Sequence, residues 1–268
     1  MNQSQNPQSA RLVGMLHMPA LPGAPRSELS IAAIEALAIR EAGMLAEAGF
    51  DACILENFGD APFHGDAVDP VTIASITRVA CALRREFPEL GLGINVLRND
   101  ASAALSIASA SEAQFIRVNV HVGTTATDQG VLHGQAARTM RMRRALQSSV
   151  QVWGDVHVKH GRSLTHEQIE QEAEDCVHRG LADALIVSGS GTGKETRLED
   201  LRSVCALRLG VPVFVGSGIT IDNVQEYLAV ADGVIVGTAL KEDGRTLAPV
   251  DADRARKLVA KARSVSKA

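Results

Sequence analysis

Polar and ionisable side chains follow short apolar segments along the first two-thirds of the chain. His17 follows segment 11–16, and Glu56 follows segment 51–55. In segments 114–120 and 150–157, polar and apolar residues alternate, so one face of each strand would carry most of the ionisable groups. The candidate catalytic residues identified in this way are His17, Glu56, Arg117, Asn119, Asp155, His157 and Lys159.

This set of side chains fits proton-transfer chemistry. The carboxylates of Asp155 and Glu56 can act as general bases, and the imidazoles of His17 and His157 can shuttle protons near neutral pH. The cationic side chains of Arg117 and Lys159 can stabilise a developing oxyanion such as an enediolate. Lys159 can instead form a Schiff base if it is desolvated. Isomerisation, epimerisation and retro-aldol cleavage are the reactions that such a set serves.

Two alternatives remain open for the same residues. Arg117 could pair with Asp155 or Glu56 in a purely structural ion-pair network. No cofactor is predicted, although His17, Glu56, Asp155 and His157 could together form a mixed nitrogen and oxygen site for a divalent ion.

Glycine-rich loops in the last third of the chain indicate a phosphate site. Glycine allows backbone N–H groups to approach an anion closely, and a serine or threonine adds a hydroxyl donor. Such loops follow the apolar segments 183–187, 211–215 and 232–236. The candidate phosphate-binding residues are Gly189, Gly191, Gly216, Ser217, Gly218, Gly237 and Thr238.

The loop 188–194 has the sequence SGSGTGK, which invites comparison with the P-loop of nucleotide-binding proteins. The P-loop pattern requires glycine where Ser188 stands and serine or threonine where Glu195 stands. We therefore interpret the loop as a set of backbone donors or a lid, with Lys194 able to cover the phosphate.

The apolar segments alternate regularly with amphipathic stretches of helical periodicity. Eight such units in 268 residues correspond to about 33 residues each, the size of a βαβ repeat. The chain shows no linker, so we predict a flexible tail at 1–10 and a single (β/α)8 barrel over 11–268. An open doubly wound sheet is the alternative, but no GxGxxG motif follows the first strand. The predicted strands are 11–16, 51–55, 91–96, 114–120, 150–157, 183–187, 211–215 and 232–236, and the predicted helices are 30–48, 70–87, 100–110, 134–147, 165–180, 197–209, 221–230 and 251–264.

Composition narrows the possible partners. A net charge of −4 and only eight aromatic residues argue against nucleic acid as a partner and favour a small polar ligand over a bulky nucleotide. No apolar run is long enough to span a membrane. The four cysteines are widely spaced and no secretory signal precedes the barrel, which predicts reduced thiols in a cytoplasmic protein. A homo-oligomer is expected because most soluble oligomers are of that kind.

Several long motifs in this chain are similar to those of the BtpA family, also called the BtpA/SgcQ family. The resemblance extends from Leu12 to about Lys261. The motifs are GMLHMPALPGAP at 14–25, LENFGDAPF at 55–63, GINVLRNDASAAL at 93–105, FIRVNVHVG at 115–123, DVHVKHGRSL at 155–164, ADALIVSGSGTG at 182–193, GSGIT at 216–220 and ADGVIVGTALKEDG at 231–244.

The resemblance implies a TIM barrel of the phosphate-binding kind, but it supplies no reaction. The family takes its name from photosystem I biogenesis in cyanobacteria, where it acts as a membrane-associated factor, and other members belong with carbohydrate metabolism. Two hypotheses follow. The protein is an isomerase, epimerase or aldolase-type enzyme acting on a small phosphorylated metabolite, or it is a non-enzymatic assembly factor associated peripherally with a membrane.

Overall fold

Eight parallel strands close into a barrel in this computed structural model, which describes residues 11–189 and 191–264. The order around the barrel is β1, β2, β3, β4, β7, β9, β10 and β11, so neighbouring strands follow one another along the chain. The predicted TIM barrel is therefore confirmed, whereas the predicted tail at 1–10 lies outside the described residues. The strands are β1 (Leu12–His17), β2 (Ala52–Glu56), β3 (Gly91–Asn95), β4 (Phe115–Val118), β7 (Gln151–Val156), β9 (Ala184–Val187), β10 (Val213–Val215) and β11 (Gly233–Val236).

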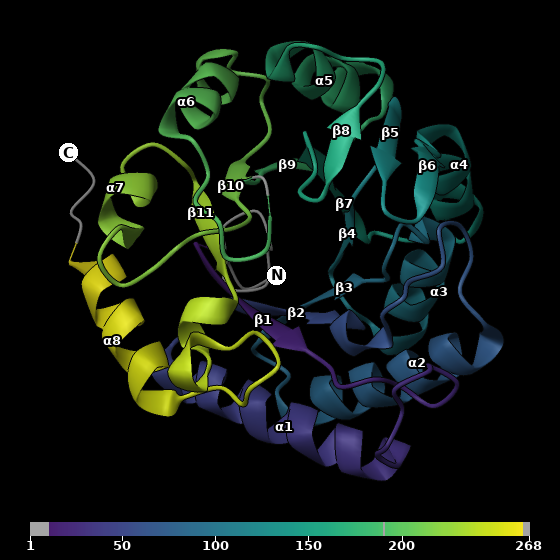
Figure 1. Ribbon diagram of the computed structural model, residues 1–268, viewed down its shortest axis with the longest axis vertical. Coiled ribbons are helices and arrows are strands. Elements are labelled where there is room, and N and C mark those ends of the chain that lie inside the picture. The colour runs from purple at the N-terminus through teal and green to yellow at the C-terminus, as the bar shows by residue number, and fades with distance from the viewer. Residues whose placement is uncertain (1–10, 190, 265–268) are drawn as a thin grey trace.

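Helices surround the barrel as a ring (Figure 1). The first helix shows how the sequence sets the boundaries. The Ser30 hydroxyl accepts the Ala33 N–H at its start, and Gly49 ends it with φ of 94°, a conformation that glycine adopts without strain. A π-helical turn at Asp175–Arg179 follows the fifth helix. The helices are α1 (Ile31–Ala48), α2 (Pro70–Glu86), α3 (Ala101–Ser111), α4 (Ala136–Ala145), α5 (Ile169–Glu174), α6 (Leu198–Ala206), α7 (Val224–Leu228) and α8 (Ala252–Arg263).

Apolar side chains fill the interior of the barrel below its carboxyl end. The Trp153 ring is stacked between Phe115 and Phe214, with centroid distances of 4.0 and 4.3 Å. Small and branched aliphatic side chains from the other strands complete this inner cluster. Trp153 faces the interior of the barrel and is fully buried, so it forms a packed floor and presents no ring to a ligand.

A small antiparallel sheet was not predicted from the sequence. It consists of β5 (Thr124–Thr127), β6 (Gly130–His133) and β8 (Gly161–Ser163), in the order β6, β5, β8. The first two strands lie in the loop after β4, and the third lies in the loop after β7 (Figure 1). The sheet therefore joins the two loops that continue from the strands carrying Arg117 and Asp155.

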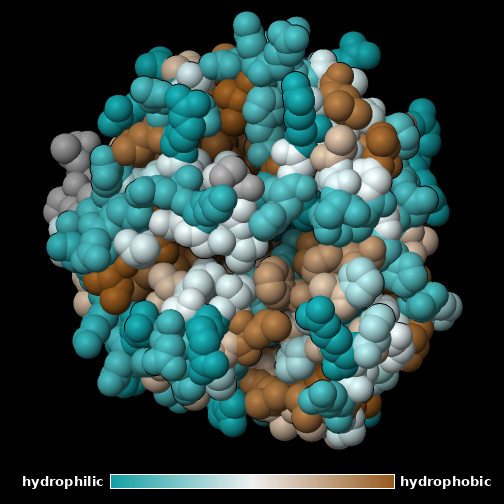
Figure 2. Space-filling model, in the orientation of Figure 1, coloured by the Kyte–Doolittle hydropathy of each residue, from teal (hydrophilic) through white to brown (hydrophobic). Residues whose placement is uncertain are grey.

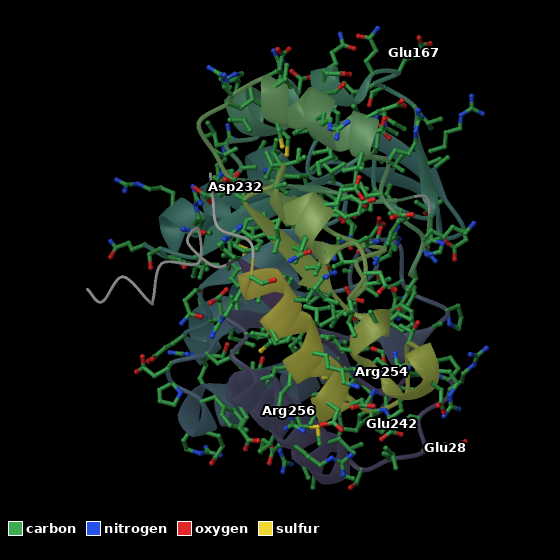
Figure 3. The ribbon with its side chains drawn as sticks, turned by 90° about the vertical axis from the view of Figure 1, so that its left-hand side faces the viewer. Glu28, Glu167, Asp232, Glu242, Arg254 and Arg256 are labelled. Carbon is green, nitrogen blue, oxygen red and sulfur yellow. The ribbon has the colours of Figure 1, made fainter. Side chains whose placement is uncertain are left out.

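Many charged side chains lie on the surface of the molecule. Glu28, Glu167 and Arg256 project outward in the side view (Figure 3). Residues of intermediate hydropathy lie near the middle of the face shown in Figure 2, inside a largely hydrophilic rim. Among residues 11–189 and 191–264, no helix has the length and apolar character needed to cross a membrane.

Candidate functional site

Four polar residues, of which three are candidate catalytic residues, lie side by side in one row across adjacent strands. In the parallel register, His17 of β1 pairs with Glu56 of β2, Glu56 with Asn95 of β3, and Asn95 with Arg117 of β4. Each of these residues is at or near the carboxyl end of its strand, where the active sites of such barrels lie. The register alone therefore gathers polar groups from four strands at one level.

Arg117 and Asp155 form a fully buried ion pair within this layer. Arg117 Nε and Nη2 donate to the Asp155 carboxylate at 3.1 Å each, and both side chains have no exposed surface. Asn119 Nδ2 also donates to the Asp155 carboxylate, at 2.6 Å. Arg117 Nη1 and Asn119 Oδ1 have no hydrogen-bond partner among the described residues. The hydrogen bonds from Arg117 and Asn119 therefore fill the acceptor positions of the Asp155 carboxylate. Asp155 lies below the pocket and does not line it.

His17 lies between a buried carboxylate and a loop carbonyl. Its Nδ1 is 3.3 Å from the carbonyl oxygen of Thr246, and its Nε2 is 3.7 Å from Glu56 Oε1. Burial, together with the nearby Lys241 and Lys159 ammonium groups, lowers the pKa of His17 well below its ordinary value. Because a carbonyl oxygen only accepts, Nδ1 carries the proton of the neutral ring and Nε2 is an acceptor.

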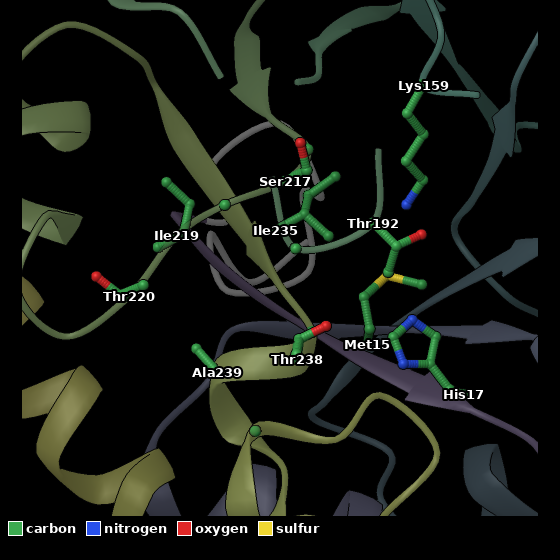
Figure 4. A pocket seen from close by; sticks show the side chains of 15 residues that line it. Met15, His17, Lys159, Thr192, Ser217, Ile219, Thr220, Ile235, Thr238 and Ala239 are labelled. Atoms are coloured by element: carbon green, nitrogen blue, oxygen red, sulfur yellow. The ribbon is translucent and has the colours of Figure 1, made fainter. Parts of the chain in front are cut away.

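Lys159 is the most perturbed cation of the site. Burial and the Arg117 charge lower its pKa from 10.5 to about 8, against the attraction of Glu56 and Asp155. Arg98 Nη2 donates to the Lys159 carbonyl oxygen at 2.6 Å, which holds the backbone at this point. In Figure 4 the side chain extends into the pocket with its ammonium group toward Thr192.

These side chains belong to a pocket with two different walls. His17 and Lys159 lie on one side, with Thr192 of the loop after β9 between them, and the loops after β10 and β11 lie on the other side (Figure 4). Of the seven candidate catalytic residues, His17 and Lys159 line this pocket; Glu56, Arg117, Asn119 and Asp155 are buried beneath it. The phosphate candidates on the opposite wall are Gly216, Ser217, Gly218, Gly237 and Thr238.

Hydrogen bonds between the glycine loops show which phosphate candidates already have partners within the protein. The Ser217 hydroxyl accepts the Gly189 N–H at 2.7 Å and donates to the Lys194 carbonyl at 3.0 Å. These bonds tie the loop after β9 to the loop after β10, so neither the hydroxyl nor the Gly189 N–H is free to bind an anion. Gly191 lies next to His160 and does not line the pocket, whereas its neighbours Thr192 and Gly193 do.

Gly218 requires the absence of a side chain. Its φ is +75°, and a Cβ atom there would lie 2.2 Å from the Cα of Glu195. The two loops can therefore approach each other only because position 218 is glycine.

The prediction, from alternation along segment 150–157, that His157 shares a strand face with Asp155 is wrong. Strand β7 ends at Val156, and His157 has a left-handed φ of 49°, so the alternation of the strand does not extend to it. Its Nε2 lies 3.5 Å from Glu172 Oε2 on α5, outside the barrel. His121 is also turned outward, and its Nε2 contacts the Gly180 carbonyl oxygen at 2.8 Å.

The displacement of His157 also separates the four residues considered as ligands of a divalent ion. Asp155 is engaged by Arg117 and Asn119, and His157 lies on the other side of β7. Within the described ranges, no group of three or more histidine, cysteine, aspartate or glutamate residues is arranged to hold a metal ion.

Two contributors to the site were not singled out from the sequence. Arg98 is buried and contacts the Lys159 backbone, and Thr192 lines the pocket. The polar run Arg98–Asp100 after the third strand was the available signal for the first. For Thr192 the available signal was a hydroxyl group within the glycine-rich loop 188–194.

Known proteins resemble this chain both in sequence and in fold. An uncharacterized protein of Methanocaldococcus jannaschii is 46% identical over 92% of this chain and 93% of its own length. The photosystem I biogenesis protein BtpA of Synechocystis is 42% identical over 93% of this chain and 85% of its own length.

Among solved structures, phosphoribosyl anthranilate isomerase from Thermus thermophilus has a TM-score of 0.56 at 14% identity, and KGPDC from Streptococcus mutans has 0.58 at 14%. Each similarity covers 95% of this chain and 98% of the other, and at this identity it establishes the barrel fold alone. The model of the BtpA family matches residues 8–264. The chain therefore belongs to the BtpA family.

Proposed function

We propose that this protein is an enzyme acting on a small phosphorylated metabolite at the carboxyl end of the barrel. The observation that carries the proposal is the two-walled pocket. Its glycine loops provide a wall suited to a phosphate group, and its opposite wall presents a depressed-pKa lysine and a neutral histidine. Perturbed ionisable groups in a cleft favour a functional role over a structural one.

The phosphate would be bound by Gly218, Gly237 and Thr238, because Gly216, which also lines the pocket, donates its N–H to the Val187 carbonyl oxygen at 2.8 Å. These residues follow the seventh and eighth strands of the barrel, where phosphate sites of TIM barrels are commonly built. The Lys159 ammonium group on the opposite wall favours an anionic ligand. The relatives in fold include an isomerase of a phosphoribosyl compound, which supports the same ligand class for this chain.

The reacting carbon would then lie on the side of His17 and Lys159. The acceptor Nε2 of His17 can take a proton from the substrate, and the Glu56 carboxylate, 3.7 Å from the same nitrogen, favours the imidazolium that forms. Lys159 can stabilise negative charge on a substrate oxygen. The buried Arg117–Asp155 pair contributes rigidity and electrostatic field beneath the pocket. This division of roles supports isomerase, epimerase or lyase chemistry.

Binding of inorganic phosphate tests the proposal. We expect calorimetry to show saturable binding to the wild-type protein and weaker binding to Thr238→Val, which removes a hydroxyl from the pocket wall. Ser148→Ala removes a hydroxyl at the opposite end of the barrel and is the matched control. Equal affinity in all three proteins, or phosphate found away from residues 216–218 and 237–238 in a soaked crystal, would refute the phosphate site.

A second candidate function is that of an assembly factor with peripheral membrane contact. The observation that favours it is the 42% identity to the Synechocystis protein named for photosystem I biogenesis. An assembly role through the surface does not need the pocket lysine. If Lys159→Met fully restores a Synechocystis strain that lacks its own relative and is rescued by the wild-type chain, the assembly role is supported and the enzymatic role is not.

A further inference from the structure

Lys159 and Lys241 are both buried, but their surroundings differ. Lys241 has no exposed side-chain surface, and its Nζ donates to Glu41 Oε2 at 2.7 Å. Lys159 is also buried, but no carboxylate lies within 4.0 Å of its Nζ among the described residues. One lysine is thus a structural ion-pair partner, and the other presents its amine to a pocket.

The two carboxylates that attract the Lys159 charge are already engaged by other groups. Asp155 accepts hydrogen bonds from Arg117 and Asn119, and Glu56 accepts one from Asn95. With Arg98 also buried nearby, two guanidinium groups already balance the two carboxylates. A proton on Lys159 therefore adds an uncompensated charge, so a larger share of this amine is neutral than in an exposed lysine.

The position of the amine relative to the glycine loops fits a covalent role. Lys159 projects from one wall of the pocket, and the candidate phosphate loops form the other (Figure 4). A ligand whose phosphate occupied those loops would bring its other end toward the amine. The Arg98 hydrogen bond to the Lys159 carbonyl fixes the backbone from which the side chain extends.

We propose that Lys159 Nζ is a nucleophile that forms an imine with the carbonyl carbon of a phosphorylated aldehyde or ketone. This inference rests on the proposed function and specifies its substrate class. The neutral amine attacks the carbonyl carbon, a C–N bond forms, and the carbonyl oxygen leaves as water with the two protons that the nitrogen loses. His17 Nε2, an acceptor on the same wall, can relay one of those protons.

The intrinsic reactivity of Lys159 is tested first, with the smallest carbonyl compound. Wild-type protein is treated at pH 7 with formaldehyde and cyanoborohydride, and methylation is followed at each lysine by peptide mass spectrometry. A pKa of about 8 leaves roughly 200-fold more neutral amine than an ordinary lysine has. We expect Lys159 to react at least about tenfold faster than the exposed Lys257 and Lys261, with restricted access reducing the full factor. Reaction no faster than theirs overturns the proposal.

Substrate-like probes test the covalent step itself. Dihydroxyacetone phosphate and glycolaldehyde phosphate are each added with cyanoborohydride, which reduces an imine to a stable amine. We expect a peptide carrying Lys159 to gain the mass of one probe less one oxygen atom, and we expect no such gain at that position in Lys159→Arg. Failure of both probes to form this adduct, or an adduct confined to other lysines, overturns the proposal even if Lys159→Arg does not fold.

Inorganic phosphate separates this inference from the proposed function on which it rests. Phosphate has no carbonyl group, so any slowing of formaldehyde labelling at Lys159 reports occupancy of the pocket alone. Protection by phosphate without an adduct from either probe leaves the phosphate site standing and removes the imine. Absence of protection counts against the phosphate site itself.

Discussion

Replacing Lys159 by methionine should stabilise the folded protein at pH 7. Lys159 is buried, and its pKa falls from 10.5 to about 8 on folding, a difference of about 2.5. Each pKa unit corresponds to about 1.36 kcal/mol, so the wild-type protein gives up about 3 kcal/mol of stability to keep this ammonium group buried. Methionine retains an apolar chain of similar length, and the hydrogen bond from Arg98 to the backbone carbonyl remains.

The pH dependence of this effect has a definite sign. Between about pH 8 and pH 10.5 the unfolded chain holds the Lys159 proton and the folded protein does not, so the wild-type protein gains stability as pH rises through this window. The advantage of Lys159→Met is therefore largest at and below pH 7 and declines toward pH 10.5.

Urea denaturation of both proteins at several pH values between 6 and 10 measures the difference in the free energy of unfolding. Lys257→Met, at an exposed position of α8, is the matched control and should change stability little at any pH. A Lys159→Met protein less stable than wild type at pH 7, or a difference that is the same at every pH, would show that the lysine is not held at an electrostatic cost.

Three further substitutions test other parts of the site. Asp155→Asn should lower the free energy of unfolding by about 3 kcal/mol in urea denaturation, because it leaves the Arg117 charge buried without its partner; an unchanged midpoint would contradict this. Gly218→Ala should abolish calorimetric phosphate binding, because a Cβ with φ of +75° cannot fit 2.2 Å from the Glu195 Cα; retained affinity would refute the loop contact. Burial raises the pKa of Glu172, so the wild-type protein loses stability relative to Glu172→Gln as pH rises from 4 to 7. Thermal unfolding measures that trend, and a reversed trend would count against the assignment.

The barrel could be predicted from the sequence because its signals are local. Apolar segments and helical stretches repeat along the whole chain, and α8 at Ala252–Arg263 lies within the predicted helix 251–264. The sheet formed by β5, β6 and β8 could not be predicted in the same way. Its strands have three or four residues each, and β8 pairs with β5 across more than 30 positions of the chain. Only the folded loops bring them together.

The site was predictable in residue types but not in side-chain orientation. Alternation correctly placed Arg117 and Asp155 toward each other, because both lie within or near the regular ladder. It failed for His157, where the ladder had already ended and the backbone turned. Alternation also could not show that the Ser217 hydroxyl is already hydrogen-bonded, since its partners Gly189 and Lys194 come from a different loop.

The two roles assigned to the pocket place opposite demands on Lys159. A protonated amine attracts an anion, whereas imine formation requires the neutral amine. Anion affinity should therefore fall as pH rises through about 8, while the rate of carbonyl labelling at Lys159 should rise over the same range. Sulfate is a suitable anion because its charge does not change in this range.

In Lys159→Met the affinity for sulfate should be weaker and should lose its pH dependence near 8. If the affinity of the wild-type protein does not change between pH 7 and 9, the amine does not face the anion. The two glycine loops and the lysine would then serve different ligands, and a single phosphorylated carbonyl compound could not be the substrate of both walls.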